Sequence, residues 1–220
     1  MAEKQIKIII VDDHPLVRQG MKKVIEKEGN LIVINEAGSA EEAIRLISQE
    51  EPDLAIVDIS LESEASGIDL IKAMRDRYPR IKTLVLSMHD ENVYAERALR
   101  AGARGYVAKK EAPAVIIEAI RTVMKGELYL SGKISIKIID RLFQGKDTSA
   151  QSLPELLSDR ELEIFRMIGG GMGTGDIAKK LNISVNTIES HRKKIKDKLG
   201  IHKGSELVKA AVQWAVSQNK

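Results

Sequence analysis

Five short apolar runs, rich in Ile and Val, recur in the first half of the chain at intervals of 22 to 29 residues. They are Ile6–Val11, Leu31–Ile34, Leu54–Val57, Thr83–Leu86 and Gly105–Val107. Each run is followed by a turn and about a dozen residues with helical apolar spacing, so predicted strands alternate with helices. This alternation is typical of βαβ units. It predicts a doubly wound α/β domain that contains a five-stranded parallel sheet. This domain is expected to end near Gly126.

The second part of the chain is predicted to be helical. Residues 131–143 have a helical apolar stripe, residues 144–154 have the composition of a flexible connector, and further helices are expected over 158–168, 176–181, 184–199 and 205–217. A short turn joins the two middle helices, and the second of them is amphipathic and basic, which predicts a helix-turn-helix. We therefore expect a domain over 1–128, a helical linker and connector over 129–153, and a smaller all-α domain over 154–220.

Local start signals support several of these helices. Ser39 with Glu42, and Ser158 with Glu161, have the spacing of a capping box. Pro113 lies at the expected first turn of a helix, where a backbone N–H has no partner within the helix and its absence in proline costs nothing.

Composition excludes several classes of protein. The chain has no cysteine, which excludes disulfides, thiolate metal sites and cysteine nucleophiles, and its four histidines are too scattered to suggest a structural zinc site. Of these, His14 and His89 are expected to be surface residues. No apolar run is long enough to span a membrane, and the N-terminus has no secretion signal. We therefore expect a cytoplasmic protein with no membrane partner.

Positive charge is concentrated in the C-terminal part. Residues 154–220 hold 12 basic and 8 acidic side chains, whereas residues 1–153 hold 23 basic and 24 acidic ones. Within residues 191–198, five of the eight side chains are Lys or Arg. Such a density attracts phosphate backbones, so the helix-turn-helix is the expected contact with nucleic acid.

Polar residues of particular types follow four of the five predicted strands. They are Asp12 and Asp13 after the first, Asp58 after the third, Ser87 after the fourth and Lys109 after the fifth. Because open parallel sheets bind ligands at the carboxyl ends of their strands, we expect these residues to meet. Three converging carboxylates repel one another unless a cation lies among them, and oxygen ligands favour Mg²⁺. One carboxylate can then attack a phosphoryl group while a lysine and a hydroxyl contact the transferred oxygens.

The segments that contain these residues resemble a bacterial two-component receiver domain, which has a flavodoxin-like fold. The resemblance covers residue 5 to about residue 126 and rests on the segments 8–18, 52–61, 84–88 and 102–109. It implies that Asp58 accepts a phosphoryl group from a histidine kinase, and that the protein is a regulator rather than an enzyme, apart from phosphoryl transfer and dephosphorylation at its own Asp58.

The resemblance also implies roles for the neighbouring residues. Asp13 and Asp58, with the backbone carbonyl of Ser60, are expected to ligate Mg²⁺, and Asp12 supports the ion through water. Ser87 and Lys109 are expected to bind the acyl phosphate, and Tyr106 is the aromatic residue that changes rotamer with Ser87. The spacing from Tyr106 selects Lys109 rather than the adjacent Lys110.

The loop after Asp58 departs from the receiver pattern. Leu61 and Glu62 stand where receivers commonly have Met-Pro, and the expected glycine, Gly67, comes one residue late. We expect a remodelled loop whose acidic insert, residues 62–64, affects the lifetime of the phosphate and the choice of kinase.

The basic helix has the features of a recognition helix. Ser184 is the expected N-cap, and Ile188, Ile195 and Leu199 form an inward stripe. Such a helix fits the major groove with its N-terminal half against base edges and its lysines on phosphates.

The segments 157–161, 176–184, 186–191, 195–200 and 206–208 resemble the LuxR-type helix-turn-helix. Together with the receiver, the chain is similar to the NarL/FixJ class of response regulators over nearly its whole length. By position, Glu189, Ser190 and Lys193 are expected to face bases in double-stranded DNA. Thr187, Arg192, Lys194 and Lys198 are expected to lie nearer the DNA backbone.

The DNA-binding part also departs from the pattern. Glu189 replaces a lysine that many relatives have, and a carboxylate there favours a cytosine amino group and repels phosphate. Gly173 and Gly175 replace residues that often touch phosphates, so weak binding per monomer is expected. The apolar face of the last helix belongs either to a dimer contact or to the domain core.

The leading hypothesis is therefore a transcriptional regulator in which phosphorylation of Asp58 favours a homodimer that binds paired half-sites on DNA. Three alternatives stay open at this point. The first is a Mg²⁺-dependent phosphohydrolase, although no carboxylate lies in 59–61 to act as general acid. The second is a flavodoxin-like cofactor carrier, although 3% aromatic residues leave little to stack on a flavin. The third is a receiver module whose helical domain binds a protein instead of DNA.

Overall fold

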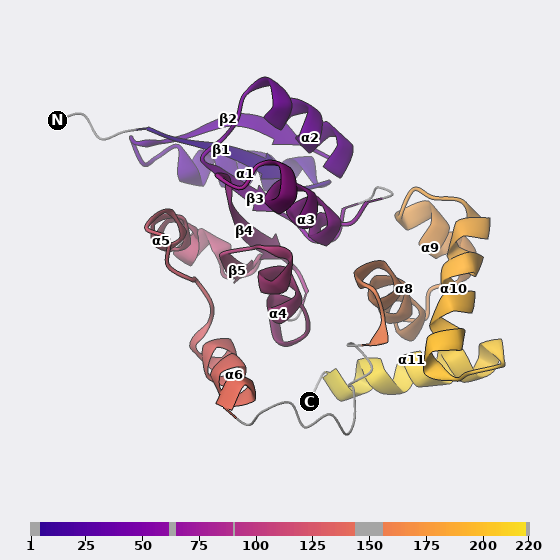
Figure 1. Cartoon of the computed structure of the whole chain (residues 1–220). Helices are drawn as coiled ribbons and strands as arrows, with labels where there is room; N and C mark the ends of the chain where they lie inside the picture. The colour runs from indigo at the N-terminus through magenta and orange to yellow at the C-terminus, as the bar shows by residue number, and fades with distance from the viewer. Residues whose placement is uncertain (1–4, 62–64, 90, 144–155, 219–220) are drawn as a thin grey trace. The chain divides into compact units, whose positions relative to one another are not determined.

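The computed structural model describes residues 5–61, 65–89, 91–143 and 156–218. The contacts between residues divide the chain into two compact units, one with the described residues up to 143 and one with residues 156–218 (Figure 1). The acidic insert 62–64 and the connector 144–154, both singled out from the sequence, lie outside the described residues.

The first unit is built on a five-stranded sheet in which all neighbouring strands are parallel. Its strands are β1 (Ile6–Val11), β2 (Leu31–Ala37), β3 (Leu54–Val57), β4 (Lys82–Ser87) and β5 (Gly105–Ala108), in the order β2-β1-β3-β4-β5. The predicted fold class is thus confirmed. The central strand β3 is apolar and buried throughout, because helices cover both faces of the sheet.

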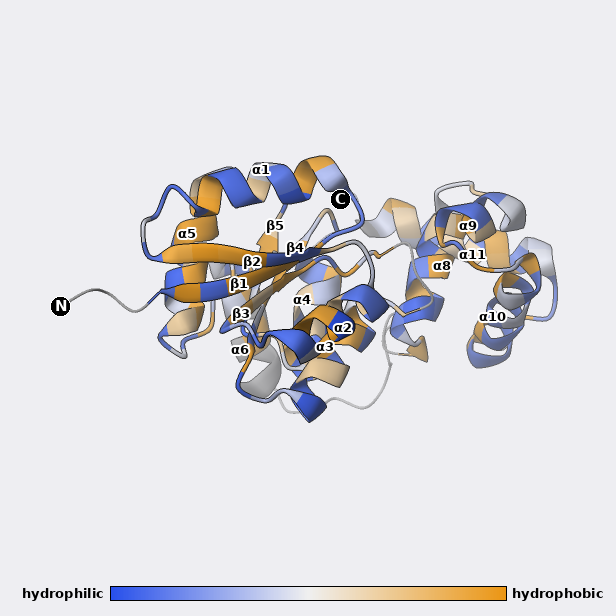
Figure 2. Ribbon diagram, turned by 90° about the horizontal axis from the view of Figure 1, so that it is seen from above, coloured by the Kyte–Doolittle hydropathy of each residue, from blue (hydrophilic) through white to orange (hydrophobic). Residues whose placement is uncertain are grey.

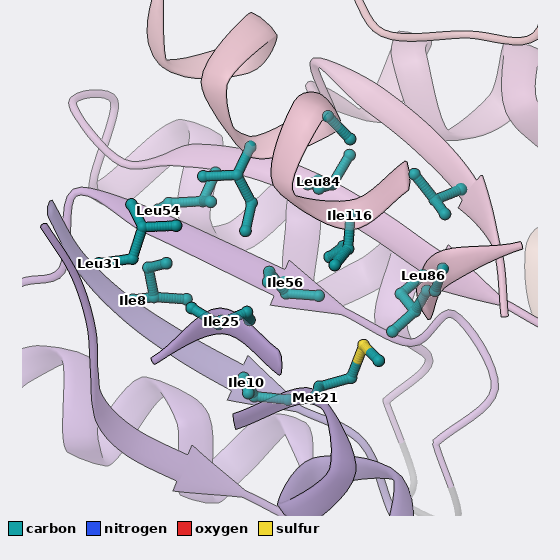
Figure 3. Packing of buried hydrophobic residues seen from close by; sticks show 14 of the residues in the cluster. Ile8, Ile10, Met21, Ile25, Leu31, Leu54, Ile56, Leu84, Leu86 and Ile116 are labelled. Atoms are coloured by element: carbon teal, nitrogen blue, oxygen red, sulfur yellow. The ribbon is translucent and has the colours of Figure 1, made fainter. Parts of the chain in front are cut away.

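The covering helices are α1 (Pro15–Ile25), α2 (Ala40–Gln49), α3 (Gly67–Arg77), α4 (Glu91–Ala101) and α5 (Ala112–Met124). Figure 2 shows α1 and α5 on one face and α2, α3 and α4 on the other, with apolar colour concentrated on the strands. On the α1 and α5 side, strand residues such as Ile8, Ile56 and Leu84 pack against Ile25 and Ile116 (Figure 3). This core fixes the strand ends that carry the candidate site.

The helix caps differ in one respect from the expectation. At α2, the Ser39 hydroxyl accepts a hydrogen bond from Glu42 N, but the Glu42 carboxylate accepts from Gly38 N instead of Ser39 N. The full capping box predicted there is therefore wrong, because the Glu42 carboxylate pairs with the N–H of the preceding residue, Gly38. Pro113 does lie in the first turn of α5.

The segment after α5 packs onto the same unit. Tyr129 O accepts a hydrogen bond from Tyr106 N at 2.9 Å, and Ser131 N donates to Glu91 Oε1 at 3.0 Å. These bonds lead into helix α6 (Gly132–Phe143), where Ile134 is buried.

The second unit consists of α8 (Asp159–Gly169), α9 (Thr174–Lys180), α10 (Val185–Leu199) and α11 (Gly204–Gln218). The capping box of Ser158 and Glu161 is complete. Helices α8 and α11 cross closely at Gly169, where a Cβ atom would lie 2.5 Å from Ala211 O. The buried rings of Phe165 and Trp214, with centroids 5.8 Å apart, extend this contact. Among the described residues, no helix is both long and apolar enough to cross a membrane.

Candidate functional site

The ends of β1, β3 and β5 bring two buried carboxylates and one lysine together. Asp12 and Asp58 are 1% and 4% exposed, and each is anchored through its backbone, since Asp12 N donates to Ala37 O and Asp58 N donates to Val11 O. The Lys109 ammonium bridges them, with Nζ 2.6 Å from Asp12 Oδ2 and 2.7 Å from Asp58 Oδ2. The sequence-based expectation that these three residues meet agrees with this geometry.

Burial governs the electrostatics of this cluster. It raises the pKa of Asp58 to about 6, although Lys109 and the Ser60 N–H act in the opposite direction. For Lys109, burial by itself would lower the pKa, but the attraction of Asp58 and Asp12 outweighs it and the pKa is raised. Lys109 therefore carries a positive charge beside a carboxyl group that resists ionisation, and a further cation would lower the energy of the ionised form.

Asp13 completes the acidic group at the end of β1. Its Oδ1 lies 2.7 Å from His14 Nδ1, and His14 N donates to Asp12 Oδ1 at 2.9 Å. The ligand atoms of Asp12, Asp13, His14 and Asp58 all lie within 4.8 Å of one another. Three carboxylates around one lysine leave a negative excess, and their oxygens are the ligands that Mg²⁺ prefers, so these residues fit a divalent metal ion.

His89 is not the surface residue expected from the sequence. It is 7% exposed, its ring stacks on Tyr94 at a centroid distance of 4.9 Å, and its Nε2 forms a short contact with Ser60 Oγ. The expectation was wrong because the β4–α4 loop folds back toward the loop after Asp58. His89 lies three residues after the end of the predicted strand Thr83–Leu86, and this placement was the available signal.

The same loop connects Ser87 and Tyr106. Ser87 is fully buried and its hydroxyl accepts from His89 N at 3.1 Å, while Tyr106 is 1% exposed and its hydroxyl donates to His89 O at 3.0 Å. Lys109 N donates to Ser87 O at 2.8 Å. The hydroxyl, the aromatic residue and the lysine expected from the sequence are thus linked through one loop beside Asp58.

In the second unit, α10 carries the predicted recognition surface. Ser184 caps the helix by accepting from Thr187 N at 3.0 Å, and Ile188 and Ile195 are buried. The outward-facing candidates Thr187, Glu189, Ser190, Lys193, Lys194 and Lys198 are exposed. Arg192 is mostly buried, with 16% of its side chain exposed.

Two family models match this chain. Residues 8–121 match the response regulator receiver domain, and residues 155–211 match the bacterial regulatory proteins of the luxR family.

The chain is a response regulator of the NarL/FixJ class.

Full-length relatives agree with this membership. The oxygen regulatory protein NreC of Staphylococcus aureus (strain MRSA252) is 36% identical over 211 residues, which cover 94% of this chain and 97% of that protein. NreC of Staphylococcus carnosus (strain TM300) is 34% identical with the same coverage. Among solved structures, the RcsB response regulator of Salmonella typhimurium is similar with a TM-score of 0.65 and 28% identity, covering 96% of this chain and 98% of that one.

Membership in this family removes two of the three alternatives that the sequence left open. Response regulators with a luxR-type domain are phosphorylation-dependent transcription regulators and not enzymes, so the phosphohydrolase and the cofactor carrier are set aside. One neighbour is RcsB from Salmonella enterica bound to a promoter in the presence of the phosphomimetic BeF3-, with a TM-score of 0.62, 28% identity and coverage of 94% of this chain and 98% of that one.

The response regulator keeps its glycine close to the loop that follows Asp58, despite the shifted spacing. Gly67 N donates to Ile59 O at 3.1 Å, and Gly67 starts α3 directly beside the backbone of Asp58. Ser66 and Asp69 form a capping box there, which the sequence interpretation missed although the spacing was readable.

Two charged candidates of the response regulator's DNA-binding surface have partners on a neighbouring helix. Lys198 Nζ lies 2.6 Å from Glu161 Oε2, on α8. Burial by itself would raise the pKa of Glu161, but the bonds from Lys198 and Ser158 outweigh it and lower the pKa. Glu189 accepts a hydrogen bond from Thr174 Oγ1 at 3.0 Å. Neither contact was predictable from helical spacing, because each joins two different helices.

Proposed function

We propose that Asp58 is the phosphoacceptor and that a histidine kinase supplies the phosphoryl group from its phosphohistidine. The observation that carries this proposal is the buried bridge of Lys109 between Asp58 and Asp12. An Asp58 carboxylate oxygen attacks phosphorus, the bond from phosphorus to the histidine nitrogen breaks, and the imidazole leaves. Lys109 then pairs with the negative charge of the transferred group.

Mg²⁺ is the proposed cofactor. Asp13, Asp58 and the backbone carbonyl of Ser60 would hold it, and Asp12 would support it through water. When bound, the ion supplies the screening that lets negatively charged groups approach each other. The Ser60 N–H donates to Asp58 Oδ1 at 3.1 Å, which keeps that carboxylate oriented.

Ser87 and Lys109 are proposed to bind the acyl phosphate, and Tyr106 to change rotamer with Ser87. The bond from Tyr106 to His89 O supports this role, since a shift of Ser87 moves the loop to which the tyrosine is attached. Phosphorylation adds about −1.5 to −2 charges. To move the protein from a mostly inactive to a mostly active population, the phosphoryl group must favour the active state by up to about 5.5 kcal/mol.

The phosphorylated protein is proposed to bind double-stranded DNA as a homodimer. Glu189, Ser190 and Lys193 face bases, and Thr187, Arg192, Lys194 and Lys198 lie nearer the backbone. Support comes from the exposed N-terminal half of α10 and from RcsB, for which two dimers bound to two parallel DNAs have been described. The two linked DNA-binding domains of a dimer bind paired half-sites more strongly than one domain binds a single half-site.

The proposed division of labour follows the expected boundaries, with the receiver over 1–128, a linker over 129–153 and the DNA-binding domain over 154–220. A regulator that binds chromosomal DNA works in the cytoplasm of a bacterium, which is the proposed location.

Phosphotransfer is tested by treating the full chain with a small-molecule phosphodonor and Mg²⁺ and measuring the mass of the intact protein. We expect one phosphoryl group on the wild type and none on Asp58→Ala. Gel filtration and DNA binding, measured on the same samples, are expected to change only for the wild type. If Asp58→Ala is modified and responds as the wild type does, the phosphoacceptor assignment is wrong.

The assignment of Lys193 to the bases and of Lys194 to the DNA backbone is tested with Lys193→Ala and Lys194→Ala. A bound sequence is first selected from randomised duplexes, and affinities for it and for mixed-sequence DNA are then compared. Lys193→Ala is expected to weaken specific binding more than mixed-sequence binding, because it faces bases. Lys194→Ala is expected to weaken both and to lower the salt dependence. Equal effects of the two changes on both DNAs would contradict the assignment.

A further inference from the structure

The recognition helix carries an acidic residue that is held in place from a neighbouring helix. Glu189 Oε1 accepts a hydrogen bond from Thr174 Oγ1 at 3.0 Å, and Arg192 Nε lies 3.6 Å from the same oxygen. Thr174 is the first residue of α9, so the contact joins the two helices of the helix-turn-helix. We call Thr174, Glu189 and Arg192 the carboxylate clasp.

The clasp leaves Glu189 available to a ligand. Its side chain is 58% exposed, whereas that of Arg192 is 16% exposed. Glu189 lies in the N-terminal half of α10, next to the exposed Ser190 and one turn before the exposed Lys193. Both contacts of the clasp engage Oε1. The carboxylate is therefore restrained through one oxygen while its side chain stays at the surface.

The charges around Glu189 favour an approach to DNA in spite of its own negative charge. Arg192, Lys193 and Lys194 follow it on the same helix, so the local excess is positive. A carboxylate in such a setting adds little affinity, because phosphate repels it. Its contribution lies in discrimination, since a misplaced charge penalises the wrong partner.

An ionised carboxylate accepts hydrogen bonds and cannot donate them, which restricts the base edges it tolerates. In the major groove, guanine presents acceptors at N7 and O6 and thymine an acceptor at O4, so both repel it. Adenine offers an amino group beside the acceptor N7. Cytosine offers its N4 amino group without that neighbouring acceptor, and it is the base that Glu contacts in recognised pairings.

We propose that Glu189 is a specificity-determining residue that selects cytosine at one position of each half-site, and that Thr174 is the positioning residue that holds its carboxylate toward the groove. This inference rests on the proposed DNA-binding function and deepens it.

The experiment uses the full, phosphodonor-treated chain and a pool of randomised DNA duplexes, from which bound molecules are selected and sequenced. Competition binding then compares the selected duplex with versions substituted at single positions. The wild type is expected to prefer cytosine at one position by about tenfold or more. Glu189→Gln, in which an amide replaces the carboxylate, is expected to lose that preference or transfer it to adenine.

Three further variants separate positioning from folding. Thr174→Val removes the hydroxyl at nearly constant volume and is expected to reduce the cytosine preference severalfold while affinity for mixed-sequence DNA stays unchanged. Thr174→Ser keeps the hydroxyl and is expected to retain the cytosine preference that Thr174→Val reduces. Asp197→Asn, an exposed acidic residue of the same helix, is the matched control and is expected to leave every base preference unchanged.

The outcomes distinguish the two levels of the proposal. If the wild type selects a sequence and Glu189→Gln selects the same one with the same base preferences, the role of Glu189 is overturned while DNA binding stands. If Thr174→Val keeps the full cytosine preference, the positioning role of Thr174 is overturned. If the wild type selects no sequence, the proposed DNA-binding function is overturned and this inference with it.

Discussion

A Cβ atom on Gly67 would lie 1.9 Å from the backbone oxygen of Asp58 and 2.6 Å from the Cα atom of Ile59. The first turn of α3 therefore touches the backbone of the proposed phosphoacceptor, and only glycine leaves room for that contact. Gly67 is not in the left-handed region, so this glycine is required by close approach and not by its backbone angles.

The first prediction concerns this contact. Gly67→Ala forces α3 away from Asp58 and is expected to lower the free energy of unfolding of the receiver by about 2–4 kcal/mol, as overpacking and backbone displacement do. Chemical denaturation of the full chain measures it. The control is Gly20→Ala on α1, where nothing lies within 4 Å of the added atom. There alanine is expected to stabilise the helix by up to about 1 kcal/mol. Equal effects at both positions would contradict the close approach.

The second prediction uses two adjacent lysines. Lys109 is 8% exposed between two carboxylates, whereas the Lys110 side chain is 78% exposed. Lys109→Met leaves Asp12 and Asp58 buried without their cation, which is expected to cost about 3–5 kcal/mol of stability and to abolish phosphorylation by a small-molecule donor. Lys110→Met is expected to change neither by a measurable amount. Denaturant titration and intact-protein mass separate the two variants, and a phosphorylated Lys109→Met protein would refute the role of Lys109.

The third prediction is a pH dependence. The pKa of Asp58 in the folded protein, about 6, is higher than its ordinary value of 3.8. Between these values the unfolded chain releases a proton that the folded protein keeps, so the contribution of Asp58 to the free energy of unfolding falls as pH rises from about 4 to 6 and stays low above that range. Asp58→Asn removes the group that titrates, so this decrease in the free energy of unfolding is not expected in the variant. Lys109 keeps Asp12 as its partner there.

With a chelator present, Asp58→Asn is therefore expected to be more stable than the wild type at pH 7, by about 2–3 kcal/mol, and to differ little from it at pH 4. Unfolding curves at the two pH values measure the difference. Added Mg²⁺ is expected to stabilise the wild type more than the variant, because binding to the folded state shifts the equilibrium. A difference between the two proteins that does not change from pH 4 to pH 7 would show that Asp58 titrates normally.

The fourth prediction concerns Lys198 and Glu161. Because the pKa of Glu161 is lowered in the folded protein, its stabilising contribution is present above its ordinary value of 4.5 and is lost as pH falls through the lower, folded value. Lys198→Met removes the partner of this buried carboxylate, which is expected to cost about 1–3 kcal/mol at pH 7 and less at pH 3. Lys193→Met, another exposed lysine of α10, is the control and is expected to be neutral for stability.

The thermal unfolding transition of the second unit measures these changes in stability. A Lys198 variant loses both the stabilising contact with Glu161 and a positive charge, and either loss weakens DNA binding. Binding losses for Lys198→Met that persist after correction for the folded fraction would show a direct phosphate contact. Equal stability of the Lys198 and Lys193 variants would contradict the contact with Glu161.

Much of the fold and of the receiver site followed from the sequence for a simple geometric reason. Alternating apolar runs and helical stripes require a parallel sheet covered on both faces, and the carboxyl ends of parallel strands share one edge. Asp12, Asp58 and Lys109 each directly follow such a strand, so their meeting could be predicted without knowing any loop. The exposed face of α10 followed in the same way from the spacing of Ile188 and Ile195.

What only the tertiary structure decided are contacts between elements whose approach depends on loops and packing. His89 is buried because the β4–α4 loop folds toward Ser60, and periodicity describes faces of regular elements but not the paths of loops. Lys198 meets Glu161, and Thr174 meets Glu189, across different helices. Residues 37 and 15 positions apart become neighbours only when the helices pack, since the packing angle and the register of two helices are set by all the side chains between them.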